Sequence, residues 1–211
     1  LSAFSIAPGF EVELVAAEPL VEEPVAMAWD EYGRLYVVEM RSYMLDAYGA
    51  GGDLPVGRVV RLEDTNGDGR MDTSEIFLGG LVNPRAVAVV NEGILIGEPP
   101  NLWLCELPIR KALCEKKRSI GSYADDVETA NVEHMENGLM QGLDNWLYNS
   151  KSSRSMRIEA GELVEREGFF RGQWGITKDD FGRLLYNHNS TWLQADFFAA
   201  EDIVQPHEQT Y

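Results

Sequence analysis

Residues 176–188 read ITKDDFGRLLYNH, and their pattern decides the fold because the chain repeats it three more times. In each copy, alternating apolar residues lead into a polar turn that contains Gly or Asn, and a second apolar run follows. The other copies are residues 27–39 (MAWDEYGRLYVVE), 86–98 (AVAVVNEGILIGE) and 139–151 (LMQGLDNWLYNSK). Apolar residues with a period of two on both sides of a tight turn predict a β-hairpin. We therefore expect four hairpins.

The turn positions of the four copies hold residues that tolerate a positive φ. These residues are Gly33, Gly93, Asn145 and Gly182. The intervals between them are long enough for a four-stranded sheet with loops, which is how the blades of a β-propeller repeat. The sequence predicts an all-β fold, a partial β-propeller of about three to four blades of four-stranded antiparallel sheets. We expect residues 1–211 to form a single propeller portion that needs further blades or a partner chain to cover its sheet edges.

The composition excludes some partners. With 35 acidic and 18 basic residues, the formal net charge is −17, which repels nucleic acid and anionic lipid. The same acidity favours bound cations as much as it favours a merely soluble surface. No apolar run approaches the length of a membrane-spanning helix. The chain begins at Leu1 without the features of a secretory signal, which fits either a processed mature protein or a fragment.

The two cysteines, Cys105 and Cys114, lie close together in a polar segment and form no C-x-x-C metal or redox motif. We expect a local disulfide between them, with free thiols as the alternative. A disulfide favours an oxidising compartment, so we expect an exported protein in the periplasm or outside the cell. Attachment to a membrane would then come through a partner.

Residues 64–75 read DTNGDGRMDTSE and match an EF-hand-like calcium loop. Side-chain oxygens at alternate positions can converge on one Ca²⁺ ion, and Gly69 sits where the loop needs a sharp turn. The predicted ligands are Asp64, Asn66, Asp68, Asp72 and Glu75 through their side chains and Arg70 through its carbonyl oxygen. The alternative is an Asx-rich surface turn that binds nothing. Strand-like sequence flanks the loop on both sides, so we expect calcium to pin a blade loop.

A group of motifs resembles a known family. The motifs are VVEMRSY (37–43), GRVVRLEDTNGDGRMD (57–72), LVNPRAVAVV (81–90), EPPNLWLCE (98–106), VEHMENGLM (132–140), LDNWLYNS (143–150) and FRGQWGITKDDFGRLLYNHNS (170–190). They are similar to the N-terminal propeller region of the membrane-bound dehydrogenase family of planctomycetes and verrucomicrobia. That family is related to soluble dehydrogenases of glucose and sorbosone that use pyrroloquinoline quinone. The resemblance covers nearly the whole chain.

The resemblance implies roles for several residues. His134 matches the base that takes the alcohol proton as hydride leaves for the quinone, and Arg171 is a second catalytic candidate. Guanidinium, amide and indole groups suit an anionic aromatic cofactor. The candidates for binding that cofactor are Arg41, Gln173, Trp174, Asn187 and Asn189. For each residue the alternative is a structural role at a blade junction, in a turn or between blades.

Two hypotheses about function follow. The first is a calcium-binding portion of a quinoprotein-like oxidoreductase that oxidises a sugar or alcohol and passes electrons to a c-type cytochrome. The chain has no C-x-x-C-H motif, so we expect no covalent haem in it. Family members often carry a second calcium loop between two cysteines, but residues 105–114 (CELPIRKALC) offer too few carboxylates, so we expect one calcium site. The second hypothesis is a non-catalytic propeller subunit that binds a protein or glycan within a larger complex.

Overall fold

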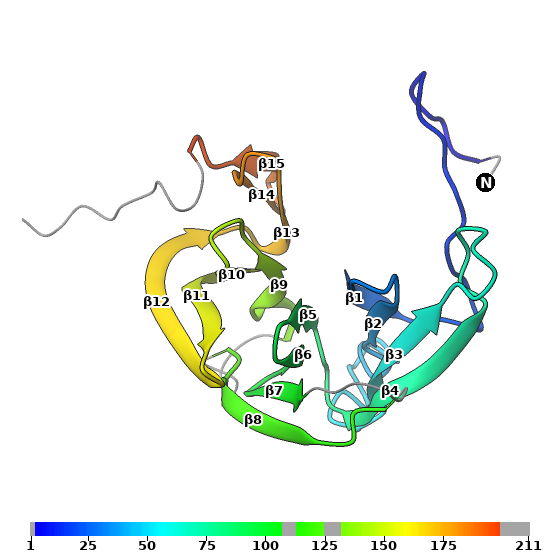
Figure 1. Ribbon diagram of the computed structural model, residues 1–211, viewed down its shortest axis with the longest axis horizontal. Coiled ribbons are helices and arrows are strands. Elements are labelled where there is room, and N and C mark those ends of the chain that lie inside the picture. The colour runs from blue at the N-terminus through cyan, green and yellow to red at the C-terminus, as the bar shows by residue number, and fades with distance from the viewer. Residues whose placement is uncertain (1–2, 107–112, 125–131, 199–211) are drawn as a thin grey trace, which may run out of the picture.

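A computed structural model describes residues 3–106, 113–124 and 132–198, and within them the protein is built almost entirely of β-strands. The strands form blades that stand around an open centre in an arc (Figure 1). One 3-10 helix, η1 (Val132–His134), precedes the third blade. No helix in the described ranges has the length and apolar character needed to cross a membrane.

Fifteen strands make up the blades. Blade 1 holds β1 (Pro24–Trp29), β2 (Leu35–Glu39), β3 (Gly57–Glu63) and β4 (Thr73–Leu81). Blade 2 holds β5 (Ala86–Val90), β6 (Gly93–Glu98), β7 (Asn101–Glu106) and β8 (Lys117–Ser122). Blade 3 holds β9 (Asn137–Gln141), β10 (Leu147–Ser150), β11 (Ser152–Glu159) and β12 (Glu162–Arg171). Blade 4 holds β13 (Trp174–Lys178), β14 (Leu184–His188) and β15 (Thr191–Ala195).

The four predicted hairpins are confirmed. They are the antiparallel pairs β1–β2, β5–β6, β9–β10 and β13–β14, which open the four blades. Each predicted turn residue has a positive φ: 77° at Gly33, 151° at Gly93, 63° at Asn145 and 82° at Gly182. The expectation of three to four blades is therefore correct. The described residues contribute three strands to blade 4, which agrees with the expectation of between three and four blades.

The first strand of each blade faces the centre of the arc, as Figure 1 shows for β1, β5, β9 and β13. Two of these inner strands come close enough to pair. Ala86 of β5 and Gly138 of β9 form a parallel bridge, which joins blades 2 and 3 into one curled eight-stranded sheet. This bridge also shows that β5 and β9 run in the same direction.

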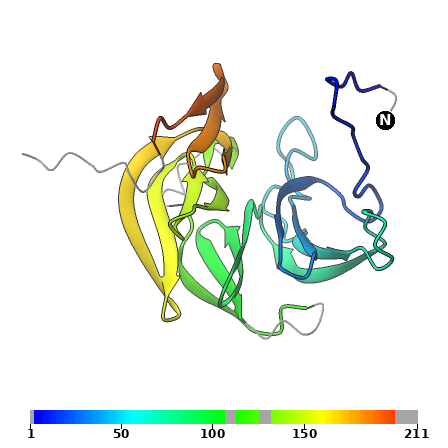
Figure 2. The ribbon, with the colours of Figure 1, turned by 45° about the horizontal axis from the view of Figure 1, so that its top comes forward.

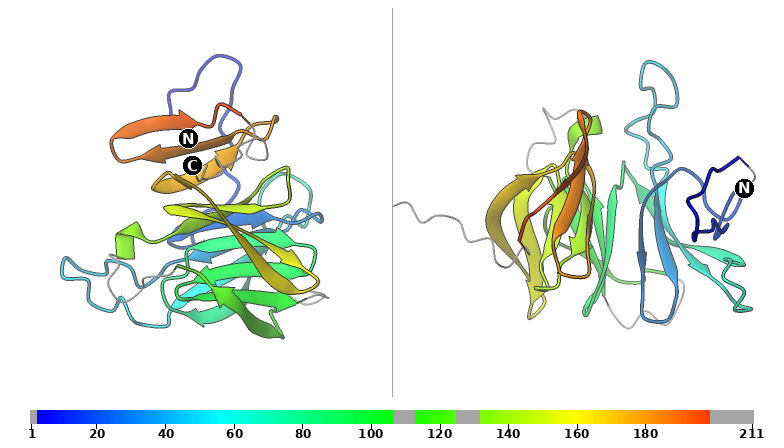
Figure 3. Two further views of the ribbon diagram at one scale, coloured as in Figure 1. Left: turned by 90° about the vertical axis from the view of Figure 1, so that its left-hand side faces the viewer. Right: turned by 90° about the horizontal axis from the view of Figure 1, so that it is seen from above.

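Apolar side chains fill the space between neighbouring blades. Tyr36 and Phe77 of blade 1 pack against Ile94 and Ile96 of blade 2, and the two aromatic rings meet edge to face with centroids 5.1 Å apart. A second cluster joins blades 2 and 3, and a smaller one around Trp146 joins blades 3 and 4. Seen from the side and from above, the blades stand next to one another in sequence order (Figure 3).

The outer face of blade 1 is covered by the N-terminal segment, which runs beside that blade in Figure 2. Ala16, Leu20 and Val21 pack on the apolar cluster that includes Leu35 and Val37. The backbone N–H of Met71 also donates to the carbonyl oxygen of Val15, 2.8 Å away. This segment therefore shields apolar surface that would otherwise face water.

The predicted disulfide between Cys105 and Cys114 is present, with Cα atoms 5.5 Å apart. Cys105 lies on β7 in the cluster between blades 1 and 2. The backbone N–H of Cys114 donates to the carbonyl oxygen of Phe77 on β4, 2.8 Å away. The bridge thus holds the β7–β8 connection against blade 1. Most of that connection, residues 107–112, lies outside the described ranges.

We expect the disulfide to stabilise the protein by closing a short loop in the unfolded chain. Replacing both cysteines by Ser should lower the free energy of unfolding by about 2–3 kcal/mol. Urea unfolding of the wild type and the double variant measures this difference. As a control, a reductant should lower the stability of the wild type and leave the variant unchanged. Equal stability of the two proteins under oxidising conditions would contradict the prediction.

Candidate functional site

The residues predicted for catalysis gather at one end of the central channel. His134 precedes β9 and Gln173 precedes β13, so both stand where the chain enters an inner strand. Because the inner strands of a propeller run in the same direction, as β5 and β9 do here, residues that precede them lie at the same end. We call it the entry end. The opposite end, which carries the hairpin turns, is the turn end.

Gln173 connects the predicted residues at the entry end. Its side-chain Nε2 lies 2.9 Å from Nδ1 of His134, and its backbone N–H donates to the carbonyl oxygen of Asn187 at 2.8 Å. The backbone N–H of Asn189 approaches Oε1 of Gln173 at 3.5 Å. The rings of His134 and Trp174 have centroids 6.3 Å apart. The structure therefore brings four of the predicted residues together around a fifth, Gln173.

The Gln173 contact determines which nitrogen of His134 carries a proton. An amide N–H donates, so Nδ1 of His134 accepts, and the neutral imidazole then carries its proton on Nε2. In this form Nε2 is a hydrogen-bond donor. For Nε2 to accept a proton, the Gln173 amide must turn over so that Oε1 faces an N–H at Nδ1. Turning the amide over breaks one contact, the 3.5 Å approach of the Asn189 N–H to Oε1 of Gln173, which is too long to be a strong hydrogen bond.

The two predicted arginines are held by acidic side chains. Arg171 is 5% exposed, and its Nε and Nη2 both lie 2.9 Å from Oδ2 of Asp196. Arg41 lies at the entry end, but its Nη2 pairs with Oε2 of Glu22 at 2.5 Å. Each positive charge is therefore already balanced inside the chain. These two residues do not fit a quinone whose carboxylates need free guanidinium groups.

A cavity of about 900 Å³ follows the inner strands. Its walls come from β1, β5, β9 and β13, and at the entry end they include Tyr43, Arg85, Glu133 and Trp174. His134 is not among its lining residues, although its neighbours Glu133 and Trp174 are. A second hollow, of about 840 Å³, lies at the turn end among Asp30, Glu92 and Asn145. The entry-end cavity is large enough for a small organic ligand.

The predicted calcium loop lies at the turn end, between β3 and β4. The Asp64 carboxylate accepts backbone N–H groups of the loop, with Gly67 at 2.7 Å and Gly69 at 2.8 Å as the shortest contacts. The hydrogen bond from the Gly69 N–H lowers the pKa of the Asp64 carboxyl from its ordinary value. Gly67 and Gly69 have φ values of 78° and 85°. The loop backbone is thus folded around an ionised Asp64.

The other predicted ligands are also bound within the loop or beside it. Asp68 accepts the backbone N–H of Arg70 at 2.9 Å, and Asp72 accepts Nδ2 of Asn66 at 3.2 Å. Glu75 lies on β4 opposite Arg61 of β3, and its carboxylate is 3.3 Å from a nitrogen of Arg61. Among the described residues, no three His, Cys, Asp or Glu side chains are grouped as for a metal. The donors suit calcium in kind, because all are hard oxygens.

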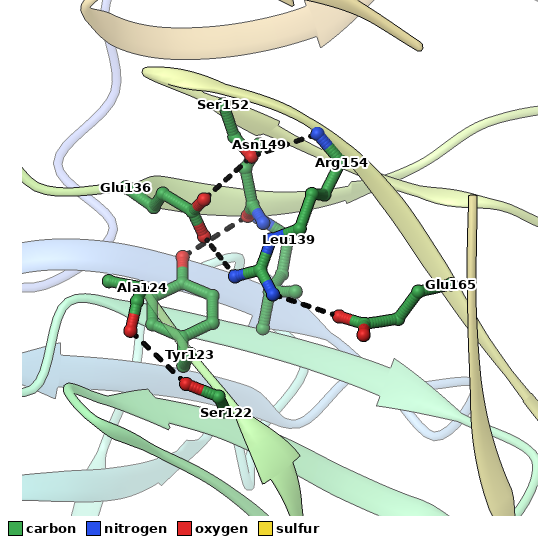
Figure 4. Close-up of polar contacts among 9 residues, drawn as sticks. All are labelled: Ser122, Tyr123, Ala124, Glu136, Leu139, Asn149, Ser152, Arg154 and Glu165. Carbon is green, nitrogen blue, oxygen red and sulfur yellow. Dashed lines mark hydrogen bonds and ion pairs between the residues drawn. The ribbon is translucent and has the colours of Figure 1, made fainter. Parts of the chain in front are cut away.

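A buried polar network joins blades 2 and 3 beside the site (Figure 4). The Tyr123 hydroxyl donates to Oδ1 of Asn149 at 3.1 Å, and the Leu139 N–H donates to the same oxygen at 2.9 Å. Glu136 accepts the Ser152 hydroxyl at 2.7 Å and pairs with Arg154 at 3.1 Å. Asn149, at the end of the third hairpin, therefore uses its Oδ1 at the blade junction, while its Nδ2 is buried and has no hydrogen-bond partner among the described residues.

Sequence reasoning missed Tyr43, Arg85 and Glu133 as residues of the entry end. Arg85 had a usable signal, because it is a single charge directly before the uniformly apolar run AVAVV. Glu133 adjoins the predicted His134. Tyr43 had no signal, since its position depends on how the loop after β2 returns toward residues 132–134. The Tyr43 hydroxyl donates to Oε1 of Glu133 at 2.7 Å across this gap.

Comparisons with known proteins agree with the fold. A family model described as a domain of unknown function, DUF7133, matches residues 1–210. No curated protein sequence matches the chain. A solved structure of a candidate gluconolactonase is similar with a TM-score of 0.56 and 17% identity, over 86% of this chain and 61% of that one. The chain therefore spans about three fifths of that neighbour, and the likeness shows the propeller fold alone.

Two solved structures of virginiamycin B lyase from Staphylococcus aureus are also similar. The selenomethionine form has a TM-score of 0.38 and 12% identity, over 82% of this chain and 69% of that one. The inactive H270A form with quinupristin has a TM-score of 0.40 and 12% identity, over 92% and 74%.

The buried network predicts how stability depends on alkaline pH. Burial, with the nearby Glu136 carboxylate, raises the pKa of Tyr123 well above its ordinary value of 10. Above pH 10 the unfolded chain releases this proton and the folded chain keeps it. The stabilisation is therefore complete below pH 10 and is lost as the pH rises, by up to about 1.4 kcal/mol per pH unit.

Tyr123→Phe tests this origin. The variant should lose about 1 kcal/mol of unfolding free energy at pH 7, because Asn149 loses one donor. Its stability should also fall less steeply than that of the wild type between pH 10 and 11.5. Urea unfolding across this range measures both effects. Tyr32→Phe, at an exposed tyrosine, is the matched control and should follow the wild-type curve. Parallel curves for Tyr123→Phe and the wild type would refute the prediction.

Proposed function

This chain belongs to the DUF7133 family, and we propose that its propeller is the calcium-binding part of a quinoprotein-like oxidoreductase that oxidises a sugar or an alcohol. The observation that carries the proposal is the grouping of His134, Gln173 and Trp174 at the entry end, where Trp174 lines the cavity. The resemblance to quinoprotein dehydrogenases supplies the reaction class, which makes that part an argument from analogy.

The entry end suits a hydroxylated ring. Trp174 lines the cavity and is 39% exposed, so one face can stack on a sugar. Asn137 is held by its own bonds to the backbone of this region: its Nδ2 donates to the Gln173 carbonyl oxygen at 2.9 Å, and its Oδ1 accepts the Gly175 N–H at 3.2 Å. The platform under a bound ring is therefore rigid.

His134 is the proposed base. Once the Gln173 amide has turned its Oε1 toward Nδ1–H, Nε2 of His134 can accept the substrate's hydroxyl proton. The carbon of that hydroxyl group would pass a hydride, one hydrogen with two electrons, to a two-electron redox acceptor such as the added dye, and would become a carbonyl carbon. Gln173 is then a positioning residue, because it selects the tautomer of His134. The proposed route continues to a c-type cytochrome on a partner, and no step is assigned to a quinone because Arg41 and Arg171 are already paired.

Calcium has a structural role in this proposal. Its loop is at the turn end, whereas His134 is at the entry end, so the ion would hold β3 and β4 together without touching the substrate. Hard oxygen ligands and a preformed loop favour Ca²⁺ over the smaller Mg²⁺, which loses its water shell reluctantly. The disulfide supports an oxidising location, so we propose that the protein works in the periplasm or outside the cell.

A second candidate function is a non-catalytic propeller subunit. It is favoured by the open edge of blade 4, where Trp192 of β15 is 96% exposed and Leu193 is 69% exposed. Within the described residues, β15 pairs only with β14. The occupant that fits this edge is a further propeller blade, because the neighbour of similar fold is longer than this chain. Such a blade would come from the rest of the protein or from a partner chain.

Removing one calcium ligand tests the metal site. Calorimetric titration of the wild type should show one Ca²⁺ ion bound, and saturation at about 100 times Kd should add about 2.7 kcal/mol to the free energy of unfolding. Asp64→Ala should weaken Ca²⁺ binding at least tenfold, because it removes the carboxylate that organises the loop. Asp53→Ala, at an exposed acid outside the loop, is the matched control. A wild type that gains no stability from Ca²⁺ rules the site out.

Dye reduction tests the oxidoreductase. The complete protein, with calcium bound, should reduce a two-electron dye with at least one sugar or alcohol. His134→Ala should slow this reaction about 100-fold or more. Gln173→Glu keeps an oxygen facing Nδ1 and should retain activity, while Gln173→Leu should lose it. The proposal fails if no substrate reduces dye while calcium is bound, or if His134→Ala reacts at the wild-type rate.

A further inference from the structure

Arg85 is a buried cation that lines the cavity and has no acidic partner among the residues that the structure describes. It directly precedes β5, is 4% exposed and lines the entry-end cavity. Its Nη1 donates to the carbonyl oxygen of Val132 at 2.8 Å, and its Nε makes a long contact of 3.5 Å with the carbonyl oxygen of Asn83. No carboxylate in the described ranges forms an ion pair with it.

Arg85 differs from the other buried arginines of the described residues in having no carboxylate partner. Within the described residues, three arginines are buried, and Arg61 and Arg171 both pair with carboxylates. The chain has nearly twice as many acidic as basic residues, so acids to balance Arg85 are abundant. A buried guanidinium without a counter-charge is costly to keep. Burial also lowers the pKa of Arg85, which reflects the same missing partner.

A purely structural role explains only part of this geometry. The bond from Nη1 to Val132 holds the segment before β9 against blade 2. One carbonyl oxygen does not neutralise a positive charge, and a guanidinium has five N–H donors. An anion in the cavity would supply both the charge and the missing acceptors.

The surroundings of Arg85 restrict the kind of anion. Glu133 lines the same cavity and accepts the Tyr43 hydroxyl at 2.7 Å, so a carboxylate already stands nearby. It repels a doubly charged group more strongly than a singly charged one, and the net charge of −17 adds to this effect. Trp29 and Trp174 offer aromatic surface in the same cavity. These features favour one carboxylate on a body that has an apolar ring face.

We propose that the entry end binds the carboxylate of a small sugar acid through Arg85, with the sugar ring against Trp174. This inference rests on the proposed function in that it names a substrate class for the same cavity. Binding requires no electron acceptor, so it is measurable without turnover. The ligand's carboxylate is the missing counter-charge of Arg85, and the cavity of about 900 Å³ has room for the ring.

Calorimetric titration of the full chain with D-glucuronate and with D-glucose tests the proposal, because the two probes share a ring and differ in one carboxylate. Glucuronate should bind at least tenfold more tightly than glucose, and this preference should shrink as salt is added. Inorganic phosphate should bind more weakly than glucuronate. Equal binding of glucuronate and glucose, or tighter binding of phosphate, would overturn the proposal.

Variants locate the site. Arg85→Gln should weaken glucuronate binding at least tenfold and leave glucose binding unchanged. Glu133→Gln should strengthen glucuronate binding several-fold, because it removes the nearby negative charge and keeps an oxygen for the Tyr43 hydroxyl. The matched control is Arg183→Gln, at an arginine that pairs with Asp179 at the turn end, and it should bind like the wild type.

Glu133→Gln carries the test if Arg85→Gln does not fold. Glucuronate binding that is unchanged in Glu133→Gln, or unchanged in a folded Arg85→Gln, would refute the site. Dye reduction then separates the two proposals. Glucuronate that binds through Arg85 but reduces no dye supports the acid site and counts against the oxidoreductase. Dye reduction with neutral sugars, together with no preference for glucuronate in binding, supports the oxidoreductase and counts against the acid site.

Discussion

The packing of each blade's apolar face on the next blade is the constraint on which the rest of the structure depends. Tyr36, Phe77 and Ile94 fill the first junction, and burial of such large side chains contributes about 1.5–3 kcal/mol each. The approach is closest between blades 2 and 3, where Ala86 pairs with Gly138. A Cβ on Gly138 would lie 2.9 Å from Ile176 of blade 4, so the absence of a side chain there lets three blades converge.

Several buried polar groups at the junction of blades 2 and 3 have partners inside the protein. The Tyr123 hydroxyl donates to Asn149 of blade 3, and Glu136 pairs with Arg154 within blade 3 (Figure 4). The Nδ2 atom of Asn149 is buried and has no hydrogen-bond partner among the described residues. Gly97 on β6 has no room for a side chain, since an added Cβ would meet the Tyr123 ring at 2.6 Å. Among the buried arginines of the described ranges, Arg85 stands out because it has no charged partner.

Ion pairing inside the protein also limits which arginines at the entry end can bind a ligand. Arg41 and Arg171 have the chemistry to hold an anionic cofactor, but Glu22 and Asp196 already occupy them. Of the buried arginines in the described ranges, Arg85 is the one that balances no acid, and it lines the cavity. Lys178 lines the same cavity and donates to the carbonyl oxygen of Gln141. His134, Gln173 and Trp174 stand beside the same cavity. Ligand selection by Arg85 and proton transfer by His134 are therefore separable properties of one site.

The repeated hairpin motif by itself determined where the blades begin. Apolar residues that alternate with a period of two and a turn residue with a positive φ are local properties of the chain, so the sequence shows them directly. Gly33, Gly93, Asn145 and Gly182 were all located in this way. The nearness of Cys105 and Cys114 in the sequence likewise favoured their disulfide. The partners of the charged residues were not local: Arg171 meets Asp196, and Arg85 meets Val132, only after whole blades have folded and packed. Tertiary structure alone decided which arginines are neutralised and which one faces the channel, because ion pairing depends on distances in space that residue spacing does not encode.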